Sequence, residues 1–395
     1  MAVVNRFADL APAIAAWRRD IHAHPEILFD TVRTSALVAE KLRGFGVDEV
    51  VEGIGRTGVV GVIRGRGTGS GRVIGLRADM DALPMPEATG LDYASRTPGA
   101  MHACGHDGHT AMLLGAAQYL AETRAFDGTA VVIFQPAEEG GGGGKEMVED
   151  GLMERFGIER VFGMHNMPGI PVGDFAFRPG PLMASSDNFS IVVTGRGGHG
   201  GQPHTTIDPV LAAAQIVISL QQIAGRNADP LRPVVVSVTS VRSSSHASNV
   251  IPESVKLLGT ARALDDATQD MIEARMGEIV AGVAAAHGAT ARFEYERGYP
   301  VTANAPAETE FAARVAADVV GAARVNAEAP AVMGAEDFSF MLNARPGAFV
   351  FVGNGHTAAL HHPKYDFNDE LIPVGCSYWV RLVETAMPLA DPAAA

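Results

Sequence analysis

The chain has 395 residues, of which 47% are hydrophobic and 19% are charged, and its formal net charge is −14. This length exceeds what one hydrophobic core usually organises, so we expect two domains in an ordinary soluble globular protein. The negative charge argues against nucleic-acid and anionic-membrane partners, and no apolar run reaches the roughly 18 residues that span a bilayer. The two cysteines, Cys104 and Cys376, cannot form a disulfide framework, so we expect a reducing, cytoplasmic location.

Strand and helix patterns alternate along the first half of the chain. Residues 1–20 place charges within an apolar stretch, which indicates an amphipathic helix rather than a signal peptide. The patterns that follow are a helix at 31–43, strands at 58–65 and 72–81, a helix at 111–123, and strands at 129–139 and 160–168. This alternation predicts an α/β layer of buried, largely parallel strands.

The order of the expected strands and helices changes near Met183. The patterns from there are strand 188–195, helix 209–225, strands 233–243 and 253–262, helix 267–288 and strand 290–299. The order βαββαβ is that of the ferredoxin-like split motif, a complete small domain. A helix at 308–322 and a strand at 347–355 then resume the alternation of strand and helix seen in the first half of the chain. We therefore expect an α/β domain made of residues 1–184 and 301–395, interrupted by an α+β domain at 185–300.

A run of five glycines at 140–144 follows one of the expected strands. It lacks the Lys-Ser/Thr that ends a P-loop, and no GxGxxG opens a helix after a strand. The sequence therefore gives no support to a nucleotide-binding function.

The decapeptide "MHACGHDGHT" at 101–110 concentrates the chain's metal-binding side chains. It contains one of the two cysteines, Cys104, and three of the 13 histidines, His102, His106 and His109. In an extended or looped backbone Cys104 and His106 share a side, so they can chelate one ion or bridge two.

Polar residues also follow several apolar runs, at the points where the expected strands end. They are Asp79, Asp81, Glu138, Glu139, His165 and the adjacent pair His361 and His362. Ligands gather at the carboxyl ends of strands in open α/β sheets, and buried carboxylates and imidazoles are costly unless paired or metal-bound. One such residue alone is more often a packed or hydrogen-bonded core residue, but the set favours a site for Zn, Mn, Co or Ni.

With these residues assembled, the sequence resembles the peptidase M20 metallohydrolase family. It is most similar to the amidohydrolase branch that contains hippurate hydrolases, N-acyl-amino-acid amidohydrolases and auxin-conjugate hydrolases. The similar segments run nearly from end to end and include "LRADMDALPM", "MHACGHDGHTAMLLGAA", "FQPAEEGGGG", "GMHNMPG", "GRGGHGGQPHTTIDPV", "NVIPESVKLLGTAR", "MGAEDFSF" and "LHHPKYDFNDE". The resemblance implies a metallopeptidase-like α/β catalytic domain with an inserted ferredoxin-like α+β lid and dimerisation domain.

The resemblance also implies roles for individual residues. Two divalent metal ions per subunit would be held by Cys104, His106, Glu139, His165 and His361. Cys104 would bridge the ions, and His362 stands at the family's variable position next to the ligand His361. Glu138 matches the general base. In an extended segment it would point to the opposite side from Glu139. Asp81 matches a carboxylate that orients a ligand histidine. Asp79 and Asp81 are both expected to contact the ligands rather than the ions.

Three further residues, in the inserted domain, match substrate-binding positions of the family. His199 matches a histidine that polarises the scissile carbonyl, in relatives from the other subunit of a dimer. Asn249 and Arg262 match residues that position the substrate, and an arginine can bind both oxygens of an α-carboxylate.

The expected function is hydrolysis of the amide bond of an N-acyl or N-aroyl amino acid by metal-activated water. The expected assembly is a homodimer, or a dimer of dimers, formed through the lid domain. Two alternatives stay open on the sequence. Cys104 could be the nucleophile of a metal-independent amidase, or the protein could be a non-catalytic, metal-dependent binding relative.

Overall fold

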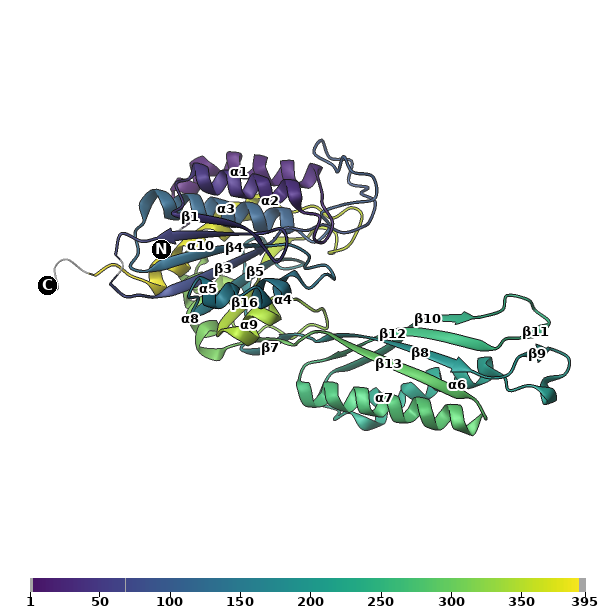
Figure 1. Cartoon of the computed structure of the whole chain (residues 1–395). Helices are drawn as coiled ribbons and strands as arrows, with labels where there is room; N and C mark the ends of the chain where they lie inside the picture. Colours follow the sequence, from purple (N-terminus) through teal and green to yellow (C-terminus); the bar gives the residue numbers. More distant parts are fainter. Residues whose placement is uncertain (1–2, 68, 391–395) are drawn as a thin grey trace. The chain divides into compact units, whose positions relative to one another are not determined.

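The computed structural model describes residues 3–67 and 69–390, which form two compact units (Figure 1). Of the described residues, the first unit takes those up to Gly180, together with Ala303–Pro330 and those from Asp337 onward. The second unit takes Pro181–Thr302 and the short segment Ala331–Glu336. Two short strands, β7 (Gly180–Met183) and β14 (Thr302–Asn304), lie where the chain passes between units.

The first unit is built on an eight-stranded mixed sheet in the order β1-β2-β4-β3-β5-β16-β6-β15. The strands are β1 (Glu49–Ile54), β2 (Gly58–Arg64), β3 (Val73–Asp79), β4 (Thr129–Gln135), β5 (Arg160–Pro168), β6 (Phe175–Ala176), β15 (Val325–Asn326) and β16 (Gly347–Gly355). The central strands β4, β3, β5 and β16 run parallel, whereas β2 is antiparallel to both β1 and β4, and β6 is antiparallel to β16. The predicted α/β class is confirmed, and its parallel character holds at the centre of the sheet.

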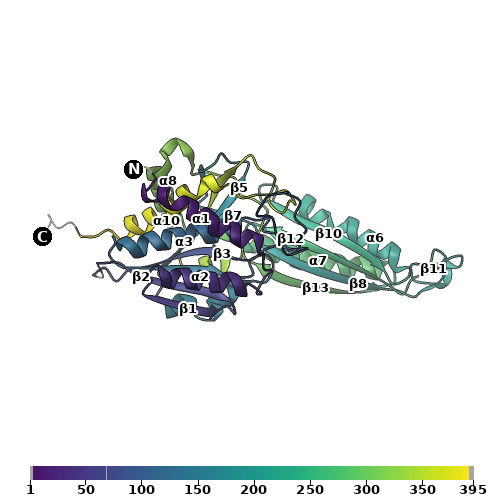
Figure 2. The same cartoon turned by 90° about the horizontal axis from the view of Figure 1, so that it is seen from above.

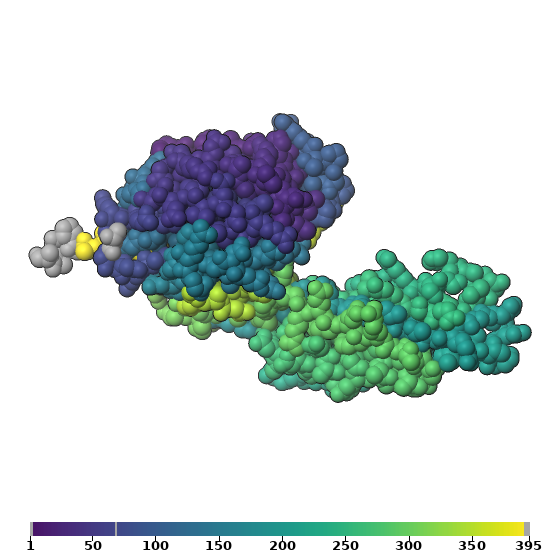
Figure 3. Space-filling model, viewed as in Figure 1, coloured from purple at the N-terminus to yellow at the C-terminus, as the bar shows by residue number. Residues whose placement is uncertain are grey.

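Helices cover both faces of this sheet, which is why its central strands are buried on both sides. They are α1 (Arg6–Ala23), α2 (Val32–Gly44), α3 (His106–Thr123), α4 (Gly143–Glu149), α5 (Leu152–Arg155), α8 (Pro306–Val320), α9 (Ser339–Ala344) and α10 (Ile372–Ala386). Figure 2 shows α8, α10, α1, α3 and α2 side by side over one face, where they share a core with Leu76, Val132 and Phe162 of the sheet. The helices α4, α5 and α9 lie on the other face. In the space-filling view the purple N-terminal part of the chain forms much of the visible surface of this unit (Figure 3).

The third helix begins earlier than the sequence predicts. We expected it over 111–123, but α3 starts at His106. Gly105 precedes it with φ of +95°, and a Cβ atom at this position would lie 2.1 Å from Oδ1 of Asn166. Only glycine fits such a backbone and such a close approach. The first turn of α3 carries no apolar periodicity because its side chains belong to the site described below.

The second unit has the predicted ferredoxin-like arrangement. Its sheet has the order β10-β12-β8-β13, and its neighbouring strands are antiparallel. The elements are β8 (Ser186–Thr194), α6 (Pro209–Leu220), β10 (Val234–Ser243), β12 (Ser254–Ala263), α7 (Asp266–Ala286) and β13 (Thr290–Tyr299). Asp208 and Asp265 begin the two helices by accepting hydrogen bonds from backbone N–H groups of the first turn. A separate pair of short strands, β9 (Gly198–His199) and β11 (Val250–Ile251), lies at one end of the unit (Figure 1).

Across residues 3–67 and 69–390, no helix combines the length and the apolar character that crossing a membrane requires.

Candidate metal centre

The polar residues at the strand ends of the first unit converge. Asp79 closes β3, His165 lies near the end of β5, and Glu138 and Glu139 follow β4. Because β3, β4 and β5 are parallel, these ends meet at one edge of the sheet. Cys104 and the beginning of α3 join them there.

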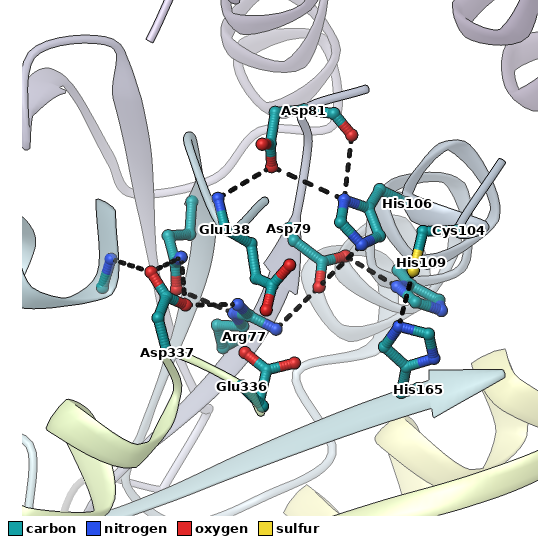
Figure 4. A network of polar contacts seen from close by, with 12 residues as sticks. Arg77, Asp79, Asp81, Cys104, His106, His109, Glu138, His165, Glu336 and Asp337 are labelled. Carbon is teal, nitrogen blue, oxygen red and sulfur yellow. Dashed lines mark hydrogen bonds and ion pairs between the residues drawn. The ribbon is translucent and has the colours of Figure 1, made fainter. Parts of the chain in front are cut away.

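All five residues expected as metal ligands lie in this cluster, which we call the metal centre. Cys104, His106 and His165 offer ligand atoms within 4.8 Å of one another, and so do Cys104, Glu139 and His361. Figure 4 shows the sulfur of Cys104 between the rings of His106 and His165. Individual distances are 3.3 Å from Cys104 Sγ to His165 Nε2 and 3.4 Å from His361 Nε2 to Glu139 Oε1.

The geometry fits a cation. Two ligand atoms bound about 2.1 Å from one tetrahedral ion lie about 3.4 Å apart, which matches these separations. Among the described residues, the buried atoms His106 Nε2 and Glu139 Oε1 have no hydrogen-bond partner, although they lie 3.9 Å from each other and His361 Nε2 lies 3.4 Å from Glu139 Oε1. Buried polar atoms normally have partners, so this pair is the observation that most directly indicates a bound ion.

The charges around the centre also favour a cation. Burial lowers the pKa of His106, but the carboxylates of Asp79 and Asp81 outweigh burial and raise the pKa to about 10. Burial also raises the pKa of the Cys104 thiol well above its usual value, and the carboxylates of Glu139 and Glu138 act in the same direction. A positive charge is thus stabilised here, and Cys104 needs a cation beside it to become a thiolate.

The histidine tautomers leave the correct nitrogen atoms for a metal. His106 Nδ1 donates a hydrogen bond of 2.8 Å to the backbone carbonyl oxygen of Asp81, so Nε2 is the ring nitrogen that an ion can bind in place of a proton. His165 Nδ1 donates to the backbone carbonyl oxygen of Asn166 at 2.7 Å, which turns its Nε2 toward Cys104. Such hydrogen bonds fix the orientation of metal-binding imidazoles.

Asp81 has a second role that the sequence does not reveal. Its Oδ1 accepts the backbone N–H of Glu138 at 2.9 Å, and its Oδ2 accepts that of Glu139 at 3.1 Å. The carboxylate therefore holds the segment that carries both glutamates, while the carbonyl oxygen of the same residue orients His106.

The expectation that Glu138 and Glu139 lie in an extended strand is wrong. β4 ends at Gln135, and both glutamates lie in a turn. Pro136 follows the strand without an N–H to continue the ladder, and Ala137 takes a left-handed φ of +55°. The turn brings a carboxylate oxygen of Glu138, one of Glu139 and a ring nitrogen of His106 within 4.8 Å of one another.

A buried ion-pair network supports Asp79 from behind. Arg77, 1% exposed, donates to Asp79 Oδ2 at 2.7 Å and to Asp337 Oδ1 at 3.0 Å. Burial raises the pKa of Asp79, but the charges of His106 and Arg77 outweigh it and hold the pKa well below the usual range. Sequence reasoning did not single out Arg77 or Asp337. The available signal was an arginine in the interior of the apolar run 73–78.

The remaining histidines of the decapeptide differ from His106. His109 is buried with both ring nitrogens in hydrogen-bond contact, through Nδ1 with Asp79 and through Nε2 with Asn166. His102 is buried as well but belongs to none of the ligand groups found in the described residues. The placement of His109 against Asp79 is a feature that the sequence analysis missed.

The structure also distinguishes the ligand candidate His361 from its neighbour His362. His361 takes a left-handed φ of +60°, and its backbone N–H donates to the carbonyl oxygen of Ala103 at 2.8 Å, next to Cys104. His362 accepts the backbone N–H of Lys364 through Nδ1 at 3.1 Å. Of the two, His361 is the one whose side chain joins the ligand group.

The candidate substrate-binding residues lie in the second unit, at two separate places. His199 in β9 is opposite Val250 of β11, and the carbonyl oxygen of Asn249 accepts the N–H of Gly200 at 2.8 Å, so His199 and Asn249 are neighbours. Ser254 begins β12, shortly after β11, the strand that pairs with the strand of His199. Arg262 lies eight residues further along β12, a distance of about 26 Å in a strand. Burial lowers the pKa of Arg262, which lies half-buried near Asp187.

The chain is similar to several known proteins over most of its length. A sequence model described as peptidase family M20/M25/M40 matches residues 75–385. The hippurate hydrolase of Campylobacter jejuni is 43% identical over 382 residues, covering 97% of this chain and 98% of that protein. The N-acetylcysteine deacetylase of Bacillus subtilis is 40% identical over 372 residues, covering 92% and 94%. The crystal structure of the Bacillus subtilis YXEP protein, a dinuclear metal-binding peptidase of the M20 family, superposes with a TM-score of 0.83 at 35% identity and covers 96% and 99%.

Proposed function

The chain belongs to peptidase family M20/M25/M40, and from this premise we propose that it is a metal-dependent amidohydrolase of N-acyl amino acids. It hydrolyses a linear amide bond, and the products are a carboxylate and a free amino acid. The observation that carries this proposal is the convergence of Cys104, His106, Glu139, His165 and His361 around buried atoms that lack hydrogen-bond partners.

These five side chains would hold two divalent ions, and Cys104 belongs to both of the ligand groups that they form. Bound divalent ions supply Lewis acidity, which polarises a carbonyl group and lowers the pKa of water. The mixed thiolate, imidazole and carboxylate set suits Mn, Zn, Co or Ni. The chain's own contribution is to fix the ligands through the contacts of Asp81, Asn166 and Ala103.

Glu138 is the proposed general base. Its carboxylate lies beside Glu139 and His106, and its backbone is held by Asp81. From this position it would take a proton from the attacking water and deliver it to the nitrogen of the leaving amine. The side chain is 7% exposed, so the transfer takes place away from bulk solvent.

His199 and Asn249 are proposed to act on the site of a second copy of the chain. Within one copy, His199 and Arg262 lie too far apart along the second unit for one small substrate to contact both. In a dimer, Arg262 would bind the substrate carboxylate, while His199 from the other copy would stabilise the oxyanion that forms at the scissile carbonyl.

The second unit offers a surface for such a dimer. Val210, Leu211 and Ile218 of α6 are 45%, 59% and 65% exposed, and they form an apolar stripe on this helix. β10 is an edge strand of its sheet and carries Val241, which is 61% exposed. An apolar helix face and an edge strand are features that oligomerisation covers, and we therefore propose a homodimer, or a dimer of dimers, through this unit.

The alternative of a Cys104 nucleophile is less well supported. The 3.3 Å contact between Cys104 Sγ and His165 Nε2 resembles a nucleophile and its base. However, burial raises the pKa of the Cys104 thiol and lowers the pKa of His165 well below its usual value, so the pair is neutral. A neutral thiol is a poor nucleophile. Both cysteines are free thiols, which accords with a proposed cytoplasmic location.

The test is a hydrolysis panel with metal-stripped protein. The stripped protein is reloaded with Mn, Zn, Co or Ni, one ion at a time, and incubated with acetyl-, benzoyl- and indole-acetyl-amino acids. Release of free amino acid that depends on an added ion supports the proposal. Activity that survives the chelator would favour the Cys104 nucleophile, and no release from any substrate would favour a non-catalytic binding protein.

A further inference from the structure

We propose that His109 is a positioning residue of the metal centre, which sets the orientation of the ligand His165 by bridging Asp79 and Asn166. This inference rests on the proposed function. It assigns His109 no metal atom and no substrate contact. Figure 4 shows its ring next to Asp79 and His165. His109 lies three residues after His106 in the first turn of α3.

The bridge is needed because two neighbouring strands separate at this point. The paired residues of β3 and β5 run from Ile74–Arg160 to Arg77–Gly163. Asp79 and His165 both come after the last pair, where the opening between the strands creates room for the centre. At this opening the backbone N–H of Asn166 donates to His109 Nε2 at 3.0 Å. The imidazole therefore takes over a hydrogen bond at the place where the ladder between β3 and β5 has ended.

The contacts of His109 define its tautomer. Nδ1 lies 2.6 Å from Asp79 Oδ1, and Asp79 is a carboxylate paired with Arg77, so Nδ1 carries the hydrogen and donates it. Nε2 must then accept the backbone N–H of Asn166, whose direction is fixed by the chain. The side-chain amide of Asn166 also lies 2.6 Å from Nε2, but an amide can turn either end to its neighbours, so it does not decide the tautomer.

The link from His109 to the ligand passes through Asn166. Its N–H is bound by His109, and its carbonyl oxygen accepts the hydrogen bond from His165 Nδ1 at 2.7 Å. The side chain of Asn166 contacts the Tyr365 hydroxyl at 2.5 Å. The His109 and His165 rings also pack directly, with centroids 4.5 Å apart and an angle of 66° between planes. The ring of His165 thus has two supports that both depend on His109.

These contacts separate His109 from the ligand His106. Both are buried, and both lie in the first turn of α3 with ring centroids 5.5 Å apart. Nε2 of His106 has no hydrogen-bond partner among the described residues, whereas both nitrogens of His109 are engaged. Positioning by hydrogen bonds to a metal ligand is worth about 10- to 100-fold in metal affinity. That range is the expected effect of removing His109.

The test compares His109→Leu and His109→Gln with wild-type protein by competition with a chelator, using Co and Zn as probes. We expect His109→Leu to weaken metal binding by about 10- to 100-fold and to shift the visible absorption bands of the cobalt-loaded protein. His109→Gln keeps an oxygen that can accept the Asn166 N–H, and should recover part of the loss. His102→Leu is the matched control, since His102 is equally buried in the same decapeptide and touches neither Asp79 nor Asn166 in the described contacts. Wild-type affinity and an unchanged cobalt spectrum in His109→Leu would overturn the proposal.

A measurement on wild-type protein keeps the proposal testable if the variants do not fold. Nitrogen-15 NMR of the histidine side chains should show His109 with hydrogen on Nδ1 and none on Nε2. The opposite tautomer would overturn the bridge. Both experiments read metal binding or tautomer rather than turnover, so they are independent of whether the panel of N-acyl amino acids identifies a substrate.

Discussion

The role of Asp81 can be tested by the substitution Asp81→Asn, which keeps the shape of the side chain. The carboxylate accepts two backbone N–H groups, from Glu138 at 2.9 Å and from Glu139 at 3.1 Å. Asparagine has one oxygen, so one of these N–H groups would face an NH2 group instead. The hydrogen bond from His106 goes to the backbone carbonyl oxygen of residue 81 and is unaffected. The substitution therefore perturbs the turn of the two glutamates. It also removes the carboxylate charge 3.5 Å from His106 Nδ1, but it keeps the hydrogen bond that orients the ring.

The expected magnitude follows from the lost contact. A hydrogen bond to a charged group contributes about 1.5–3 kcal/mol. Since about 1.4 kcal/mol corresponds to a tenfold change in rate, a loss expressed fully at Glu138 would lower kcat by about 10- to 150-fold. We expect KM to change little, because neither N–H group is proposed to touch the substrate.

The assay measures kcat and KM for release of the amino acid at saturating metal, together with metal content. Asp208→Asn is a matched control, because Asp208 also accepts two backbone N–H groups, from Val210 and Leu211, at the start of α6. Asparagine caps helices about as well as aspartate, so this variant should keep its activity. A folded Asp81→Asn protein with kcat within twofold of wild type would refute the reasoning.

Three other changes test separate parts of the structure. Cys104→Ala should lower the metal content, measured by elemental analysis, and abolish metal-dependent hydrolysis, measured by amino-acid release. Full metal occupancy with normal turnover would exclude Cys104 as a ligand. The variants Glu138→Ala and His199→Ala should each be inactive alone, but mixing them should restore about a quarter of the wild-type activity after subunit exchange. Half of the dimers would then be mixed, and each mixed dimer would hold one intact site of two. No recovery despite exchange would contradict a site shared between copies. Burial lowers the pKa of His22, but hydrogen bonds from its ring to Asp107 and Glu87 outweigh burial and raise the pKa from 6.5 to about 9. This stabilisation, roughly 3 kcal/mol, is complete below pH 6.5 and is lost as the pH rises toward 9. The difference in unfolding free energy between wild type and His22→Gln, measured in urea with chelator, should therefore narrow from pH 6 to pH 9. An equal difference at both pH values would be inconsistent with the raised pKa of His22.

Much of the fold could be predicted because its elements are long and regularly patterned. The βαββαβ order of the second unit and the central strands β3, β4 and β5 follow from apolar runs and helical periodicity. Short strands such as β6, β9, β11 and β15 have two residues each and carry no such pattern. The start of α3 was misplaced for a different reason, since its first turn consists of residues that serve the centre rather than the core.

The candidate ligands could be proposed from residue type and position, but the contacts that orient them could not. Nothing in the spacing of Asp81 and Glu138 indicates that the carboxylate of one holds the backbone of the other. His109 and His106 are both histidines of one helical turn, and only the direction of their hydrogen bonds tells a ligand from its support. Such contacts join residues far apart in sequence, and they exist only once the strand ends have been brought together.

The proposed chemistry is tested most directly by measuring metal content and amino-acid release side by side in wild-type and Glu138→Ala protein. Glu138 is not among the proposed ligands, so both proteins should bind the same amount of metal. Loss of a general base should lower turnover by about 10²- to 10⁴-fold. Release of the amino acid at the wild-type rate by fully metal-loaded Glu138→Ala would contradict the mechanism.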